Sequence, residues 1–312
     1  MRSVAADFTI MWAITVTGNH SPALRTAVIG LGMQGVLIAQ RLSRAGHLSV
    51  GIDNDSGGTA LAAGYGIPVV TSLADARDTG PIAISALASV EALNTLCAQL
   101  VNGNSAIRYL VETSAVPVAA KGRARAFLDA VGITMLDCTI IETNARPGQR
   151  EVVVCTSGPE FAVETVGPVL DAFSERVEYL GEFGTATALR LVGNLMVALN
   201  NAVVAEALTL ARRLDIDPEL VVGLLARTAA GSGQLETRGP MMAAANYNPP
   251  SASLGMFLNE VDLITDLADA AASPTPLLNS AAVLYRAAGS VLDQDLDGSA
   301  IHELYAKLPP MR

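Results

Sequence analysis

A glycine-spaced turn that joins an apolar strand to a helix constrains this chain more than any other feature. The run over residues 26–35 reads TAVIGLGMQG, so a short strand leads directly into a G-x-G-x-x-G spacing. The first glycine allows a tight turn, the second lets backbone approach a phosphate, and the third permits close packing of helix on strand. The helix N-terminus presents free N–H groups to an anion. The run therefore predicts a dinucleotide site formed by Gly30, Leu31, Gly32, Met33, Gln34 and Gly35.

An acidic residue ends the next predicted strand. Residues 48–53 read LSVGID, and Asp53 lies 18 residues after Gly35. A carboxylate near this spacing accepts hydrogen bonds from the adenosine ribose hydroxyls, and it repels a 2′-phosphate. The sequence therefore favours NAD over NADP as the cofactor.

Composition narrows the kind of partner. The chain has 312 residues, enough for two domains. Its formal net charge of −10 argues against nucleic acid and anionic membrane surfaces as partners, because both attract clustered lysine and arginine. Half of the residues are hydrophobic and the mean hydropathy is positive, which indicates apolar surface buried between subunits. We expect a small-molecule substrate and a homodimer or larger homo-oligomer.

The cysteines, the histidines and the N-terminus carry weaker signals. The three cysteines are widely spaced and support neither a disulfide framework nor a zinc pattern, and no histidine has a ligand partner at suitable spacing. No metal site is predicted. Residues 1–25 contain an apolar stretch without the basic cluster or cleavage site of a signal peptide. No run of about 18 apolar residues predicts a spanning helix elsewhere. We expect a cytoplasmic protein with an N-terminal extension over residues 1–25.

Short apolar strands alternate with helical stretches up to about residue 181, as a parallel sheet with crossover helices requires. From residue 185 a single helical run reaches Arg213, nothing after it reads as a strand, and Asp217-Pro218 predicts the start of the next helix. We expect an α/β fold, with a doubly wound, Rossmann-like parallel sheet domain over residues 26–184 and an all-α C-terminal domain over residues 185–312. Beyond the first two strands, the candidates lie at residues 67–70, 82–87, 109–114, 133–137 and 151–156.

The order of these motifs resembles the β-hydroxyacid dehydrogenases, a family that includes 3-hydroxyisobutyrate dehydrogenase and relatives of 6-phosphogluconate dehydrogenase. The resemblance covers most of the chain from residue 26 onward and is strongest at the glycine turn. It implies that Leu87 lies beside the cofactor, and that Ser114 and Ala115 lie near the nicotinamide. Alanine follows Leu87 where the family has proline, and Ala115 replaces a family threonine.

At the substrate end the chain departs from the family pattern. The family loop D-x-P-V-S-G-G corresponds to residues 137–143, so Ile141 replaces a serine that holds a substrate carboxylate, while Glu142 and Thr143 replace two glycines. The resemblance implies that these three residues contact substrate, and that a carboxylate substrate loses its usual cradle. Glu142 is either an acid that protonates substrate or binds a cationic group, or a solvated loop carboxylate.

The family's catalytic lysine is matched by Arg190, and the asparagine that follows it by Asn194. A separation of four residues places both side chains on one helix face, where they can reach one substrate oxygen. Guanidinium has a pKa above about 12 and is a poor general acid, but it can stabilise an alkoxide. The alternative for Arg190 is an ordinary ion pair between domains or subunits. A second family lysine is matched by Val261.

The resemblance implies an NAD-dependent oxidoreductase that transfers a hydride between nicotinamide and a small polar carbonyl or alcohol, with Arg190 and Asn194 as its catalytic residues. Two alternatives remain open. One is an imine reductase-like enzyme, against which Asp53 weighs because such enzymes usually prefer NADPH. The other is a non-catalytic dinucleotide-binding protein that kept the fold without either lysine.

Overall fold

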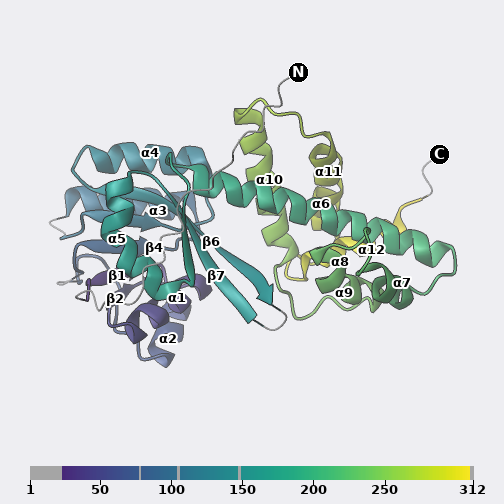
Figure 1. The fold of residues 1–312 in the computed structure, drawn as a ribbon, viewed down its shortest axis with the longest axis horizontal. Coiled ribbons are helices and arrows are strands. Elements are labelled where there is room, and N and C mark those ends of the chain that lie inside the picture. Colours follow the sequence, from purple (N-terminus) through teal and green to yellow (C-terminus); the bar gives the residue numbers. More distant parts are fainter. Residues whose placement is uncertain (1–22, 77–78, 104–105, 147–148, 310–312) are drawn as a thin grey trace, which may run out of the picture.

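An eight-stranded sheet dominates the first part of the chain (Figure 1). The computed structural model describes residues 23–309 apart from 77–78, 104–105 and 147–148, and it describes only the backbone of residues 142–146 and 149–151. The strand order is β3-β2-β1-β4-β5-β6-β7-β8. The strands are β1 (Thr26–Ile29), β2 (Leu48–Ile52), β3 (Val69–Val70), β4 (Ile82–Ser85), β5 (Tyr109–Glu112), β6 (Thr134–Arg146), β7 (Gln149–Ser157) and β8 (Arg176–Tyr179).

The predicted doubly wound sheet is confirmed. Strands β1 to β6 are parallel, and the chain builds outward from β1 to β3 before it returns to add β4 beside β1. This reversal leaves a crevice at the carboxyl ends of β1 and β4, where open parallel sheets bind their ligands. The glycine turn follows β1, so the sequence motif and the topological switch point coincide.

The far edge of the sheet differs from the prediction. β6 continues past the predicted strand end at residue 137 and pairs antiparallel with β7 as far as Arg146, so the predicted substrate loop is largely strand. β8 was not predicted at all, and it pairs parallel to β7. Thr139, Ile140 and Ile141 are β-branched and pair with Cys155, Val154 and Val153 of β7. Because such residues favour strands, the ladder extends where the family resemblance implied a loop.

Five helices cover the two faces of the sheet. Along β1, Val28 faces a core shared with α1 and α5, whereas its neighbours Ala27 and Ile29 face a core shared with α3 and α4. This alternation is the two-residue period of a strand buried on both faces. The helices are α1 (Met33–Arg44), α2 (Ser56–Gly64), α3 (Val90–Asn102), α4 (Val118–Asp129) and α5 (Glu160–Phe173).

A 29-residue helix, α6 (Thr185–Arg213), runs from the sheet across the helical part of the chain, with the bounds that the sequence predicts (Figure 1). By length and composition alone α6 could cross a membrane, but the core helix of a soluble protein passes the same test, and α6 contributes Ala198, Ala205 and Leu208 to the helical core. The remaining helices are α7 (Pro218–Leu225), α8 (Gly233–Thr237), α9 (Gly239–Ala243), α10 (Leu254–Ala270), α11 (Pro276–Val291), the 3₁₀ turn η1 (Gly298–Ala300) and α12 (Ile301–Lys307).

Candidate active site

The glycine turn has the geometry that a phosphate cradle needs. Gly30 has a φ of +89°, and a Cβ there would lie 2.3 Å from the carbonyl oxygen of Ala86. A Cβ on Gly35 would lie 1.8 Å from the carbonyl oxygen of Gly30, so these two glycines pack the turn against β4 and α1. Gly32 is exposed, has no atom within 4 Å of an added Cβ, and begins α1 without a side-chain cap. The open side of the turn therefore presents bare backbone to an anion.

Asp53 lies against this turn. One of its carboxylate oxygens accepts a hydrogen bond from the backbone N–H of Leu31 at 2.6 Å, and the other accepts one from the N–H of Asp55 at 2.8 Å. The carboxylate is thereby fixed between the end of β2 and the glycine turn. Because an ionised carboxylate offers about four acceptor positions, it keeps capacity for the ribose hydroxyls.

The ends of β4 and β5 meet beside the turn. The backbone N–H of Leu87 donates to Ser114 Oγ at 2.8 Å, and an added Cβ on Gly30 would lie 3.3 Å from Leu87 Cδ2. The buried Glu112 accepts hydrogen bonds from the N–H of Ser114 at 2.8 Å and from the hydroxyl of Ser85. Ala115 is exposed at the same edge. The fold thus gathers the predicted cofactor residues along one side of the crevice.

Arg190 and Asn194 meet on a carboxylate that the sequence analysis missed. Arg190 Nη1 lies 2.7 Å from Glu260 Oε1, and Asn194 Nδ2 donates to Glu260 Oε2 at 2.8 Å. Glu260 belongs to α10 and directly precedes Val261, whose side chain is buried in the helical core. The sequence held one signal for Glu260, which is an acid directly before Val261, the position matched to the second family lysine. The ion pair joins α6 to α10, which both belong to the C-terminal part of the chain, so it is not an ion pair between the two domains.

A buried charge cluster anchors the start of α6. Asp137, at the end of the parallel section of β6, accepts from Lys121 Nζ at 2.9 Å, from the N–H and hydroxyl of Thr187 at 2.9 and 2.5 Å, and from Ser157 Oγ at 3.2 Å. Both ends of the ion pair are buried, with side-chain exposures of 1% and 0%. The carboxylate occupies the N-terminal turn of α6, where a negative charge is favourable. It therefore fixes the helix that carries Arg190 and Asn194.

Two protein-family models match adjoining parts of the chain. The NAD binding domain of 6-phosphogluconate dehydrogenase matches residues 25–181, and the model described as the NAD-binding of NADP-dependent 3-hydroxyisobutyrate dehydrogenase matches residues 184–305. The chain belongs to the β-hydroxyacid dehydrogenase family. The family and the NAD(P)-dependent oxidoreductase class that the resemblance implied are thereby confirmed.

The relatives align with nearly the whole length of this chain. L-threonate dehydrogenase of Cupriavidus necator is 26% identical over 293 residues, which cover 89% of this chain and 95% of the relative. A structure of Mycobacterium tuberculosis 3-hydroxyisobutyrate dehydrogenase with L-serine superposes with a TM-score of 0.79 at 22% identity, covering 90% of this chain and 99% of the other. An imine reductase from Pseudomonas sp. superposes with a TM-score of 0.55 at 18% identity, covering 89% and 98%. At these identities the solved structures show a shared fold.

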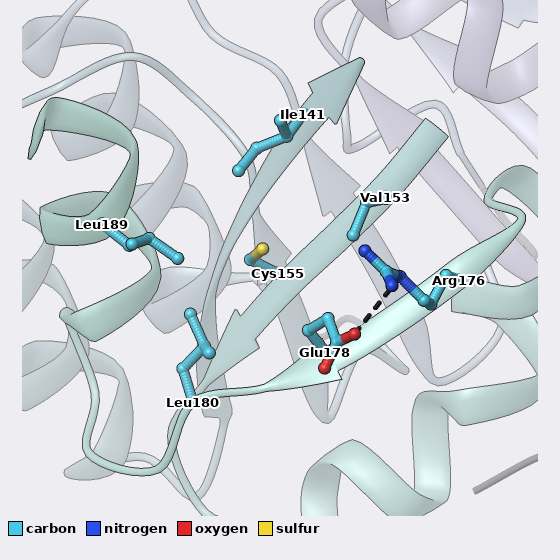
Figure 2. A pocket seen from close by; sticks show the side chains of 7 residues that line it. All are labelled: Ile141, Val153, Cys155, Arg176, Glu178, Leu180 and Leu189. Carbon is cyan, nitrogen blue, oxygen red and sulfur yellow. Dashed lines mark ion pairs between the residues drawn. The ribbon is translucent and has the colours of Figure 1, made fainter. Parts of the chain in front are cut away.

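Of the three predicted substrate residues, Ile141 alone has a described side chain, and it lines a groove that does not include Arg190 or Asn194. Ile141 lines an apolar groove of about 310 Å³ with side chains of β7, β8 and α6, and Leu189 points into it from α6 (Figure 2). An ion pair between Arg176 and Glu178 lies at its edge. The backbones of Glu142 and Thr143 pair with β7, and their side chains lie outside the part of the chain that the structure describes.

The three cysteines and the two histidines that the structure describes lie in environments that suit structural roles. All three cysteines are free and buried, and burial raises the pKa of the Cys138 thiol to about 12. His47 hydrogen-bonds the backbone of Leu24, and His302 contacts the hydroxyl of Tyr247. Within the described residues there is no group of three or more His, Cys, Asp or Glu that could hold a metal ion.

Proposed function

We propose that this protein uses NAD to transfer a hydride between the nicotinamide and a small polar carbonyl or alcohol. The observation that carries the proposal is the coincidence of two sites. An open glycine turn lies at the switch point of the sheet, and Arg190 and Asn194 lie together near the start of α6. Membership of the family supports the class of reaction. The glycine turn is the proposed site of the cofactor, and Arg190 and Asn194 are the residues proposed to act on the substrate.

Asp53 supports a preference for NAD over NADP. Its carboxylate is held in place by two backbone N–H groups, and the five residues after it read NDSGG, without a basic side chain. Enzymes that select NADP place an arginine nearby to accept the 2′-phosphate. A fixed negative charge in that position repels the phosphate instead.

Arg190 and Asn194 have complementary roles in the proposed reaction. When bound, the cofactor donates or accepts the hydride, so that a carbonyl, NADH and one proton give an alcohol and NAD⁺. The Arg190 guanidinium donates a hydrogen bond to the oxygen on which negative charge develops until the proton arrives, while the Asn194 amide orients the same oxygen. Because arginine is a poor proton donor, we propose that the proton comes from water or another side chain.

The test is a steady-state comparison of NADH with NADPH on a panel of short aldehydes, hydroxyacids and cyclic imines. We expect NADH to be preferred by about tenfold or more in kcat/KM, and Asn194→Ala to lower kcat. Turnover of cyclic imines alone, with NADPH, would support the imine reductase alternative. Saturable NADH binding without turnover of any compound would support the non-catalytic alternative.

We further propose a homodimer or larger assembly in the cytoplasm. Apolar side chains at every seventh position of α6, Leu189, Met196, Val203 and Leu210, are 44–62% exposed, and this spacing favours a helix seam. Three free, buried cysteines suit a reducing compartment. Light scattering tests the assembly, since Met196→Asp should yield monomers from an oligomeric wild type. A monomeric wild type would contradict it, and cell fractionation tests the location.

A further inference from the structure

We propose that Glu260 selects uncharged substrates and excludes carboxylates from the site formed by Arg190 and Asn194. The substrate class is then a small aldehyde, or the corresponding alcohol, whose neighbouring group is a hydroxyl and not an acid. This inference rests on the proposed function, because it takes the two residues on α6 as the place where substrate binds.

The charge of Arg190 is already neutralised within the protein. Glu260 places one carboxylate oxygen 2.7 Å from Arg190 Nη1 and the other 2.8 Å from Asn194 Nδ2, so both oxygens are engaged. The side chains of Arg190 and Glu260 are only 16% and 21% exposed, and water screens such a pair little. The site therefore presents a neutral pair, where a lone arginine would present a cation.

One donor of the pair remains for substrate. Arg190 Nη2 is buried and has no hydrogen-bond partner among the described residues. A buried N–H group without an acceptor is costly, so an oxygen of a ligand would stabilise it. A hydroxyl or carbonyl oxygen can accept this bond at no charge penalty. A carboxylate would place a second negative charge on a guanidinium that Glu260 already holds, and like charges at this distance repel strongly.

The buried lysine and arginine among the described residues are paired with other carboxylates, and the family's second lysine is absent. Val261, at the place of the second family lysine, is 1% exposed within the helical core and brings no charge. Lys121 is held by Asp137, and Arg238 is held by Asp297, with N–O distances of 2.9 Å in both pairs. None of these groups replaces the charge that Glu260 cancels.

The test compares two two-carbon aldehydes, glycolaldehyde and glyoxylate, with NADH as the reductant. They differ in carrying a CH₂OH or a carboxylate. The wild type should reduce glycolaldehyde with the higher kcat/KM. Glu260→Gln keeps the shape of the side chain and one acceptor oxygen but removes its charge. It should raise the ratio of kcat/KM for glyoxylate to that for glycolaldehyde on the order of tenfold or more.

Asp262→Asn is the matched control. Asp262 also lies on α10 and loses the same charge, but it is exposed and pairs with Arg286. It should leave the ratio of the two rates unchanged. Melting temperature and NADH affinity establish that each variant is folded and binds cofactor. A wild type that prefers glyoxylate, or a Glu260→Gln variant with the wild-type ratio, would overturn the inference.

A binding measurement separates this inference from the proposed function. If neither aldehyde is turned over while NADH still binds, the proposed reaction fails, but the charge argument can still be measured. Calorimetry of the NADH complex with glycolate should show tighter binding to Glu260→Gln than to the wild type. Equal binding, or tighter binding to the wild type, would refute the role of Glu260 whatever the reaction is.

Discussion

Replacing Lys121 with methionine should destabilise the protein by about 3 kcal/mol, because it leaves the Asp137 carboxylate buried without its counterion. The two groups lie 2.9 Å apart with side-chain exposures of 1% and 0%, so water cannot take the place of the ammonium. Methionine is of similar length and apolar, so the change removes the charge and leaves little cavity.

The size of this loss of stability depends on the hydrogen bonds that Asp137 keeps in the variant. Removing one partner of a buried ion pair costs about 3–5 kcal/mol. Asp137 retains hydrogen bonds from the N–H and hydroxyl of Thr187 and from Ser157, as well as the N-terminus of α6, which places the loss at the lower end. For a chain of this size about 3 kcal/mol corresponds to a fall in melting temperature of roughly 5 °C.

The assay is thermal unfolding followed by circular dichroism, with Asp137→Asn and the double variant as partners in a cycle. Because Lys121→Met and Asp137→Asn each remove one partner of the same pair, the double variant should be less destabilised than the sum of the single variants, by about 1.5 kcal/mol or more. A Lys121→Met protein that melts within about 1 °C of the wild type would refute the reasoning. So would strictly additive effects.

Four further outcomes are expected. Gly35→Ala should lower both the melting temperature and the affinity for NADH, because the added Cβ would lie 1.8 Å from a backbone oxygen. Gly32→Ala should keep the melting temperature and weaken only NADH binding, because no protein atom lies within 4 Å of its added Cβ. Asp53→Asn should lower the ratio of NADH to NADPH affinity by about tenfold, since it removes a charge that repels a 2′-phosphate. Burial acts to raise the pKa of Asp297, but hydrogen bonds from Ser299 and the Arg238 guanidinium outweigh it and lower that pKa to about 2. The stability from this group is therefore present above pH 4 and should fall by about 2 kcal/mol between pH 4 and 2, and Asp297→Asn should flatten that part of the curve. With its pKa raised to about 12, the Cys138 thiol should react with a disulfide reagent at pH 8 only after denaturant is added.

Features with a local signal could be predicted from the sequence. The glycine turn is a strand, three spaced glycines and a helix in one continuous run, and the structure has β1 and α1 there. The bounds of α6 also follow from local signals, since a glycine precedes it and its apolar pattern runs unbroken to Arg213. Asp217 caps α7 as predicted, with its side chain accepting from the N–H of Glu219.

Features that depend on distant partners could not be predicted. β8 is four residues long and half exposed, and only its pairing with β7 makes it a strand. Glu260 lies 70 residues from Arg190, and Lys121 lies 16 residues from Asp137 with a helix end between them. No spacing rule joins such residues, because their contacts arise from the packing of α10 on α6 and of α4 on the sheet.

The central claim is that the glycine turn and Asp53 form a site for NAD. Calorimetric titration of the purified protein with NADH and with NADPH, side by side at one salt concentration, tests it most directly. The account predicts saturable binding of NADH, about tenfold or more tighter than that of NADPH. Binding of neither cofactor, or tighter binding of NADPH, would contradict it.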